Sequence, residues 1–221
     1  MSKEIGELVV NLRCALLEKK LSADVVSSAI ETLQRLGHKT YDHVKFPELK
    51  NTDLFESEVG VTPSNLSEAL LWKLGKWPTY KTFVENYKKD NLEVSQKGGI
   101  VFSAFAKHLQ DNSLPIYDQH AIRSIWAICE LEPHETELCR KLLVDKQGSW
   151  KSSGSGDDGT CYELFLKKVN SICTNNRLSH RALDMLLMPL GQALKKETKS
   201  KRNIQVNKSE LQYFSELVGI N

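Results

Sequence analysis

Several features that mark common classes of protein are missing from this sequence. No apolar run approaches the roughly 20 residues that a membrane span requires. The N-terminal stretch, interrupted by Glu7, Asn11 and Arg13, does not form a secretory signal. The five cysteines include no CxxC pair and no zinc-binding pattern. We therefore expect free thiols, no metal, no membrane association and a location in the cytoplasm, or in the nucleus of a eukaryote.

The signatures of several enzyme classes are also absent. The chain contains no Walker-type phosphate loop, no G-x-S-x-G and no HExxH sequence, and we expect no cofactor. No segment alternates between apolar and polar residues as a half-buried strand does, so we expect no sheet. The formal net charge is only +2. A nucleic-acid-binding protein of this composition would therefore need its positive charge concentrated on one surface.

What the chain does contain is enough apolar sequence for an all-α domain, since 40% of its 221 residues are hydrophobic. Ser22 and Gly37 bracket one clear helix, and Pro133 starts another. The Gly- and Ser-rich segment 147–160 is typical of a flexible loop, which allows lobes 1–146 and 161–221 within one domain, 1–221. Helical periodicity predicts helices at 4–19, 23–36, 66–74, 78–91, 100–109, 118–129, 133–143, 161–174, 179–197 and 207–218.

The stretch from Gly98 to Arg123 carries the residues most suggestive of chemistry. It reads GGIVFSAFAKHLQDNSLPIYDQHAIR: a glycine pair, an apolar helix, a short connector and an aspartate at the start of a further helix. Glycines in such a hairpin let backbone N–H groups approach a phosphate closely, and the following helix adds its positive end. Lys97, Gly98 and Gly99 are therefore candidate contacts for DNA.

The order of these elements resembles the helix-hairpin-helix DNA glycosylase superfamily, in which an Asp-x-His-hydrophobic-x-Arg-like run follows the hairpin and connector. Here that run is Asp118 to Arg123. The resemblance implies an all-α fold with two helical lobes that binds double-stranded DNA and hydrolyses the N-glycosidic bond of a flipped-out base. Asp118 would be catalytic, stabilising an oxocarbenium-like sugar and orienting the attacking water. By the same resemblance, His120 would contact the substrate and Arg123 would contact the DNA.

Two departures from the superfamily's pattern narrow the expected activity. Its hairpin usually reads apolar-Pro-Gly-apolar-Gly, whereas residues 95–99 here contain no proline. Members that also cleave the DNA strand place a lysine two residues after the second glycine of the motif. If Gly98 takes the place of that glycine, Ile100 occupies the lysine position. The resemblance therefore implies no Schiff-base lysine and a monofunctional glycosylase at most.

Two further groups of side chains are candidate contacts for DNA or for the base. Aromatic residues interleaved with lysines can stack on bases, and we assign Trp72 and Trp77, together with Tyr117, to the substrate pocket. Clustered positive charge near the C-terminus is the best electrostatic footprint for DNA in the chain. The members of this basic run are Lys195, Lys196, Lys199, Lys201 and Arg202.

Each of these features also has a purely structural interpretation. Asp118 would serve as an ordinary N-cap of helix 118–129, and Gly98-Gly99 as a plain turn. Trp72 would be buried behind a fringe of lysines, and the basic run would be a solvated helix end. Two alternatives to base excision therefore stay open: a non-catalytic helix-hairpin-helix DNA-binding protein, and a helical protein–protein interaction or adaptor protein.

Overall fold

The computed structural model describes residues 2–39, 66–89, 93–94, 99–151, 157, 159–204 and 207–219. These residues are α-helical, as the periodicity predicts, and their one β-type pairing is a single antiparallel bridge between Val144 and Trp150. No helix in these ranges is both long enough and apolar enough to cross a membrane. The helices are α1 (Ser2–Leu17), α2 (Ala23–Arg35), α3 (Leu66–Lys73), α4 (Trp77–Lys88), α5 (Ile100–Gln110), α6 (Gln119–Ile128), α7 (Pro133–Leu143), α8 (Thr160–Asn176), α9 (His180–Ile204) and α10 (Glu210–Val218).

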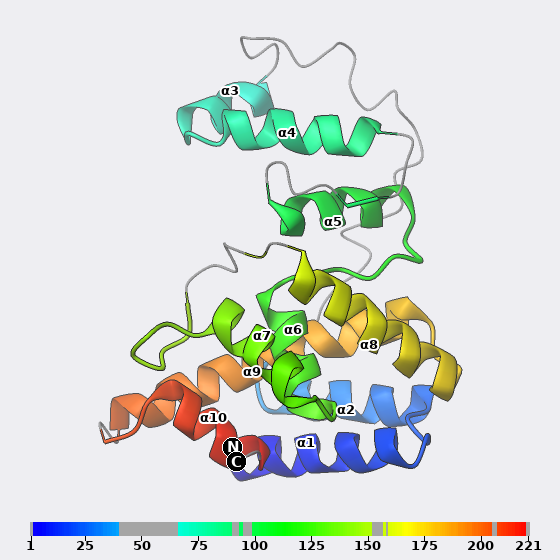
Figure 1. The fold of residues 1–221 in the computed structure, drawn as a ribbon, viewed down its shortest axis with the longest axis vertical. Helices are drawn as coiled ribbons and strands as arrows, with labels where there is room; N and C mark the ends of the chain where they lie inside the picture. Colours follow the sequence, from blue (N-terminus) through cyan, green and yellow to red (C-terminus); the bar gives the residue numbers. More distant parts are fainter. Residues whose placement is uncertain are drawn as a thin grey trace.

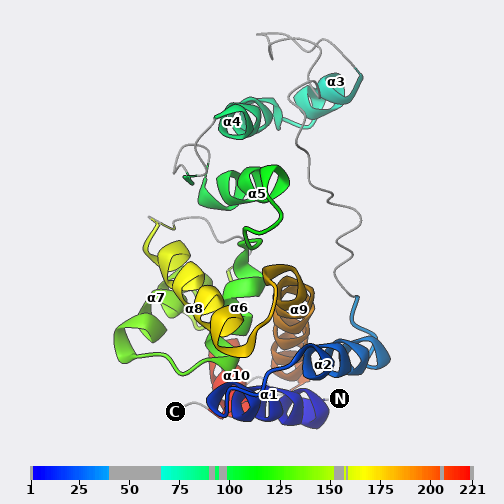
Figure 2. The same ribbon diagram turned by 90° about the vertical axis from the view of Figure 1, so that its right-hand side faces the viewer.

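Helix α6 lies in the middle of the main group of helices (Figures 1 and 2). α9 packs on one side of it, α7 and α8 pack on the other, and α1 crosses near its C-terminal end. Every residue from Ala121 to Ile128 is buried. Helices from both sides of segment 147–160 contribute to this one apolar core. The packing of the described residues therefore does not divide at that segment.

Helices α6 and α9 approach each other closely where Gly191 of α9 meets the first turn of α6. A Cβ atom on Gly191 would lie 2.0 Å from the carbonyl oxygen of His120. Nearby, the hydroxyl of Ser124 donates a hydrogen bond to the carbonyl of Leu187 at 2.5 Å. Because no side chain fits between the two backbones, glycine is required at position 191.

Helix α5 joins the main group to a smaller group made with α3 and α4 (Figure 1). Near its start, Ile100 and Ala104 belong to the main core. Further along, Ala106 and Leu109 pack with Tyr87 of α4 in a second, small cluster. Among the described residues α5 packs mainly on α4, so the smaller group comprises α3, α4 and α5 and meets the main core through the start of α5.

Most of the predicted helix limits are confirmed to within a few residues. Ser22 caps α2, and Pro133 opens α7. The helix expected at 179–197 is longer than predicted and continues to Ile204, so the basic run lies within α9 instead of after it. The predicted loop 147–160 begins with an ordered turn, in which Asp145 accepts hydrogen bonds from the backbone of Gln147 and Ser149.

Candidate functional site

Asp118 lies immediately before α6, as predicted. Its backbone is extended, and its Oδ1 accepts hydrogen bonds from the backbone N–H groups of His120 and Ala121, both at 2.7 Å. Its Oδ2 forms no hydrogen bond with any residue that the structure describes, and the side chain is partly exposed. Asp118 is thus an N-cap, as the structural interpretation expects, and at the same time a fixed carboxylate with one free oxygen.

Three basic side chains interact electrostatically with Asp118, namely His120, Arg123 and Lys195. Burial, together with the charges of Arg123 and Lys195, lowers the pKa of His120. Arg123 Nη1 lies 3.1 Å from His120 Nδ1. Because a guanidinium group can only donate, Nδ1 must accept, and the neutral His120 carries its proton on Nε2.

Arg123 is completely buried, which corrects its expected place at a DNA-facing surface. Its guanidinium group lies 4.4 Å from the centroid of the Trp150 ring and donates to the carbonyl of Gly191 at 3.3 Å. Burial lowers its pKa to about 10. Since no part of the side chain reaches the surface, Arg123 packs α6 against α9 and the 144–151 turn and does not contact a phosphate in this arrangement.

The aromatic residues assigned to the substrate pocket are not brought together. Tyr117 is 1% exposed, and its hydroxyl donates to Asp157, which also accepts a hydrogen bond from the N–H of Gly159 before α8. Trp77 is buried at the start of α4. Trp72 of α3 is 61% exposed, so its structural interpretation as a buried residue is wrong. Both tryptophans lie in the smaller group of helices, beyond α5 from Asp118 (Figure 1).

The basic run of α9 does not form one patch. Lys195 Nζ is 3.2 Å from Gln119 Oε1, at the start of α6. Lys196 lies towards the end of α2, where burial and the lysine's charge lower the pKa of His38. Arg202 donates to the hydroxyl of Ser149. Of this run, Lys195 is therefore the member that the structure places beside Asp118.

The remaining predicted DNA contacts are placed as follows. Lys97 and Gly98 lie outside the described residues. Gly99 precedes α5 with φ +98°, in the left-handed region that favours glycine. Lys199 is exposed, and Lys201 is half-buried on α9. A turn glycine at Gly99 is consistent with both the hairpin and the plain-turn interpretations.

The structure adds Asp184 of α9, whose place beside Asp118 could not be read from the sequence. Its side chain is 4% exposed, its Oδ2 accepts a hydrogen bond from Ile116 N at 3.1 Å, and its Oδ1 has no hydrogen-bond partner. Burial and the charge of Asp118 raise its pKa to about 8. Asp118 and Asp184 line the same small cavity. The one available signal was a lone acid within the apolar sequence LDMLLMPL.

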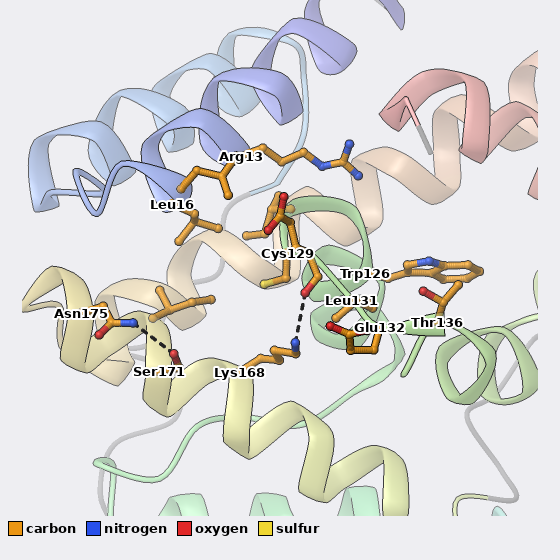
Figure 3. Close-up of a pocket in the computed structure, with 14 residues that line it drawn as sticks. Arg13, Leu16, Trp126, Cys129, Leu131, Glu132, Thr136, Lys168, Ser171 and Asn175 are labelled. Carbon is orange, nitrogen blue, oxygen red and sulfur yellow. Dashed lines mark hydrogen bonds between the residues drawn. The ribbon is translucent and has the colours of Figure 1, made fainter. Parts of the chain in front are cut away.

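A larger groove lies at the opposite end of α6 (Figure 3). Its volume is about 670 Å³, and it is bounded by α1, the α6–α7 connection and α8. The two cations that line it already have partners. Arg13 Nε donates to the carbonyl of Ala127 at 2.7 Å, and Lys168 Nζ lies 2.6 Å from a carboxylate oxygen of Glu135. None of the candidate catalytic, substrate-binding or DNA-binding residues lines this groove.

Within the described ranges, no group of three or more His, Cys, Asp and Glu side chains is arranged to hold a metal ion. No family model matches this chain, and neither a curated protein nor a solved structure is detectably similar to it. The function must therefore be argued from the geometry around Asp118 and from the groove.

Proposed function

We propose that the protein binds double-stranded DNA and excises a flipped-out base as a monofunctional DNA N-glycosylase, with Asp118 as its catalytic carboxylate. The observation that carries this proposal is the fixed orientation of that carboxylate. Two backbone N–H groups hold Oδ1 at 2.7 Å, while Oδ2 is left for a reacting group.

The surroundings of Asp118 suit the hydrolysis of an N-glycosidic bond. Positive charge develops on the sugar as the base departs, and an ionised carboxylate stabilises it and orients the attacking water. The backbone N–H groups at the N-terminus of α6 hold this carboxylate in one orientation. Lys195 supplies a cationic hydrogen-bond donor near it, which suits contact with a phosphate or a base.

The start of α5 supports hydrolysis without a Schiff base. Ile100, at the position where strand-cleaving relatives of the resembled superfamily would place a lysine, is a buried residue in the first turn of α5. A buried aliphatic side chain offers no amine to attack the sugar. Water is therefore the nucleophile in this proposal, and an abasic site is the product.

A base-excision assay tests the proposal. Duplex oligonucleotides carrying a panel of damaged, mismatched and modified bases are incubated with the protein, and hot alkali then reveals abasic sites. We expect product from the wild type on at least one substrate. We expect a loss of about 100-fold or more for Asp118→Asn, since asparagine keeps the cap but not the charge.

The chain offers a matched control at Asp145. Its Oδ1 also accepts two backbone hydrogen bonds, at 2.9 and 2.8 Å, but in a surface turn. Asp145→Asn should retain full activity. Absence of product from the wild type on every substrate would refute the enzymatic proposal. Salt-dependent binding in the same samples would then identify a non-catalytic DNA-binding protein.

A helical interaction protein is the second candidate, and the groove of Figure 3 favours it. Its volume of about 670 Å³ lies within the range of about 300–1,000 Å³ that is usual for ligand sites. Ser171 is exposed on its α8 wall. Under this candidate, Ser171→Trp fills the groove and abolishes partner binding, whereas Asp118→Asn leaves it unchanged. The base-excision proposal expects the reverse pattern for DNA.

A further inference from the structure

A small cavity, partly open to the surface, lies where the start of α6 meets α9. Its volume is about 10 Å³, which is roughly the space that one water molecule needs. Asp118 and Asp184 supply its only carboxyl groups, and its other lining side chains are Ile116, Ala121, Leu187 and Met188. A water molecule there would have two carboxyl groups as its side-chain partners.

One carboxyl oxygen of Asp184 lacks a hydrogen-bond partner at this cavity. Its Oδ1 is buried without a partner, although the opposite oxygen accepts from Ile116 N. Leaving a buried polar atom unpaired is costly, so such atoms are usually satisfied by protein or by ordered water. The cavity that Asp184 lines is of the right size for that water.

Apart from the backbone N–H of Ile116, none of the groups that act on Asp184 among the described residues stabilises a negative charge on it. The titratable groups with which it interacts are Asp118, before α6, and Cys173, on α8, and both are acidic. Burial and the charge of Asp118 raise the pKa of Asp184 to about 8. At neutral pH Asp184 therefore keeps its proton and can donate a hydrogen bond.

We propose that the cavity between Asp118 and Asp184 binds one water molecule, through which the protonated carboxyl group of Asp184 holds the carboxylate of Asp118. The O–H of Asp184 donates to the water, and the water donates to Asp118. Asp184 is then a positioning residue. The water site stands independently of the enzymatic activity, whereas its effect on base excision rests on the proposed function.

Ionisation of Asp184 would undo this arrangement. An ionised Asp184 has no proton to donate, and the two carboxylates repel each other across the cavity. The water-mediated link to Asp118 is therefore present at neutral pH and is lost as the pH rises through the pKa of Asp184. Asp184→Asn keeps one acceptor and gains a permanent donor, so this variant preserves the link at every pH.

Infrared spectroscopy and crystallography test the site without any need for activity. We expect the wild type at pH 6 to show the C=O stretch of a buried neutral carboxyl group, which disappears above about pH 8. Asp184→Asn should lack this band, and Asp145→Asn should keep it. A high-resolution crystal structure should show one water between the two side chains in the wild type and in Asp184→Asn, but not in Asp184→Leu. No neutral carboxyl band, or a dry cavity, would overturn the proposal.

The pH profile of base excision tests the positioning role. Wild-type activity should fall as the pH rises past about 8, whereas Asp184→Asn should retain it there. Asp184→Leu should lose about 10-fold to 100-fold at all pH values, since small misplacements of a reacting group cost this much. An unchanged alkaline limb in Asp184→Asn would overturn the positioning role. A wild type with the neutral carboxyl band and the water but no excision would refute the glycosylase and leave the water site standing.

Discussion

The buried carboxyl groups at the two ends of helix α6 have pKa values that are shifted in opposite directions. At the N-terminal end, Asp184 has one backbone N–H as a partner and another aspartate nearby, and its pKa is raised to about 8 by burial and that charge. At the C-terminal end, burial also acts on Glu135, but hydrogen bonds from Lys168, the backbone of Glu132 and Lys167 outweigh it and lower the pKa to about 2. The two side chains are almost equally buried, at 4% and 3% exposed. Burial alone would raise the pKa of both groups, and only Glu135 has enough hydrogen bonds to reverse the shift.

This contrast assigns different roles to the two ends. The carboxylate of Glu135 is fully matched by cations, as expected of a group that holds α7 and α8 together. Asp184 has no such ion pair among the described residues, and the charge of Asp118 acts on it instead. A buried carboxyl group with a strongly shifted pKa is more common in functional sites than elsewhere. The N-terminal end of α6, where Asp184 lacks an ion pair, is thus the better candidate for a reactive site. The C-terminal end, where lysines pair with Glu135, is better suited to holding helices together.

The largest expected effect comes from a substitution that disrupts the contact between α9 and the N-terminal end of α6. Gly191→Ala would place a Cβ atom 2.0 Å from the carbonyl oxygen of His120, so α6 and α9 must move apart. We expect a loss of about 4 kcal/mol in the free energy of unfolding, because overpacking against backbone is poorly relieved. Urea unfolding followed by circular dichroism measures it. Gly6→Ala, whose Cβ would lie 3.1 Å from the carbonyl of Leu217, is the control and should cost clearly less. Equal losses would show that the α6–α9 contact is not tight.

The second effect concerns the pH dependence that Asp184 imposes. Its pKa is raised from 3.8 to about 8, so the folded state binds the extra proton between these values and stability falls as the pH rises through this window. At about 1.4 kcal/mol per pKa unit, and allowing for relaxation around the cavity, we expect Asp184→Asn to be more stable than the wild type by about 3 kcal/mol at pH 8. The advantage should vanish near pH 4. Unfolding free energies across this range provide the measurement, and parallel curves for both proteins would contradict the shift.

The third effect is a pH dependence of stability that has the opposite sign to that of Asp184. The pKa of Glu135 is lowered from 4.5 to about 2, so its contribution is fully present above pH 4.5 and is lost as the pH falls towards 2. We expect Glu135→Gln to cost about 2 kcal/mol at pH 7, because Lys168 is left beside an uncharged partner. Glu137→Gln, which removes an exposed pair with Arg140, should cost much less. A Glu135→Gln penalty that persists at pH 2 would argue against this ion pairing.

Local sequence chemistry was sufficient to predict α6 and its cap. An aspartate followed by an amphipathic run is a short-range signal, and Asp118 caps the helix as predicted. The closeness of Gly191 to His120 and of Asp184 to Asp118 depends on how α9 crosses α6. Such contacts join residues far apart in the chain, and helical periodicity contains no information about them.

The burial of individual large side chains was the least predictable feature. The family resemblance assigned Arg123 to the DNA contact, yet its side chain is buried against the Trp150 ring and the carbonyl of Gly191. Trp72 and Trp77 are only five residues apart, but the first is exposed and the second buried, because α4 packs on α5 while α3 lies at the edge of its group. Tertiary packing set these outcomes, and the composition of the neighbouring sequence did not.

The smallest expected effect distinguishes the two lysines that pair with Glu135. Lys168 Nζ lies 2.6 Å from the carboxylate and its side chain is 18% exposed, whereas Lys167 Nζ lies 3.3 Å away on a side chain that is 73% exposed. We expect Lys168→Met to cost about 1 kcal/mol and Lys167→Met less than about 0.5 kcal/mol, since water screens the exposed pair. Urea unfolding at low and high salt measures both, and the Lys167 effect should disappear in high salt. Equal costs for the two variants would mean that net positive charge, and not a desolvated ion pair, lowers the pKa of Glu135. The C-terminal end of α6 would then differ from the Asp184 end in charge alone.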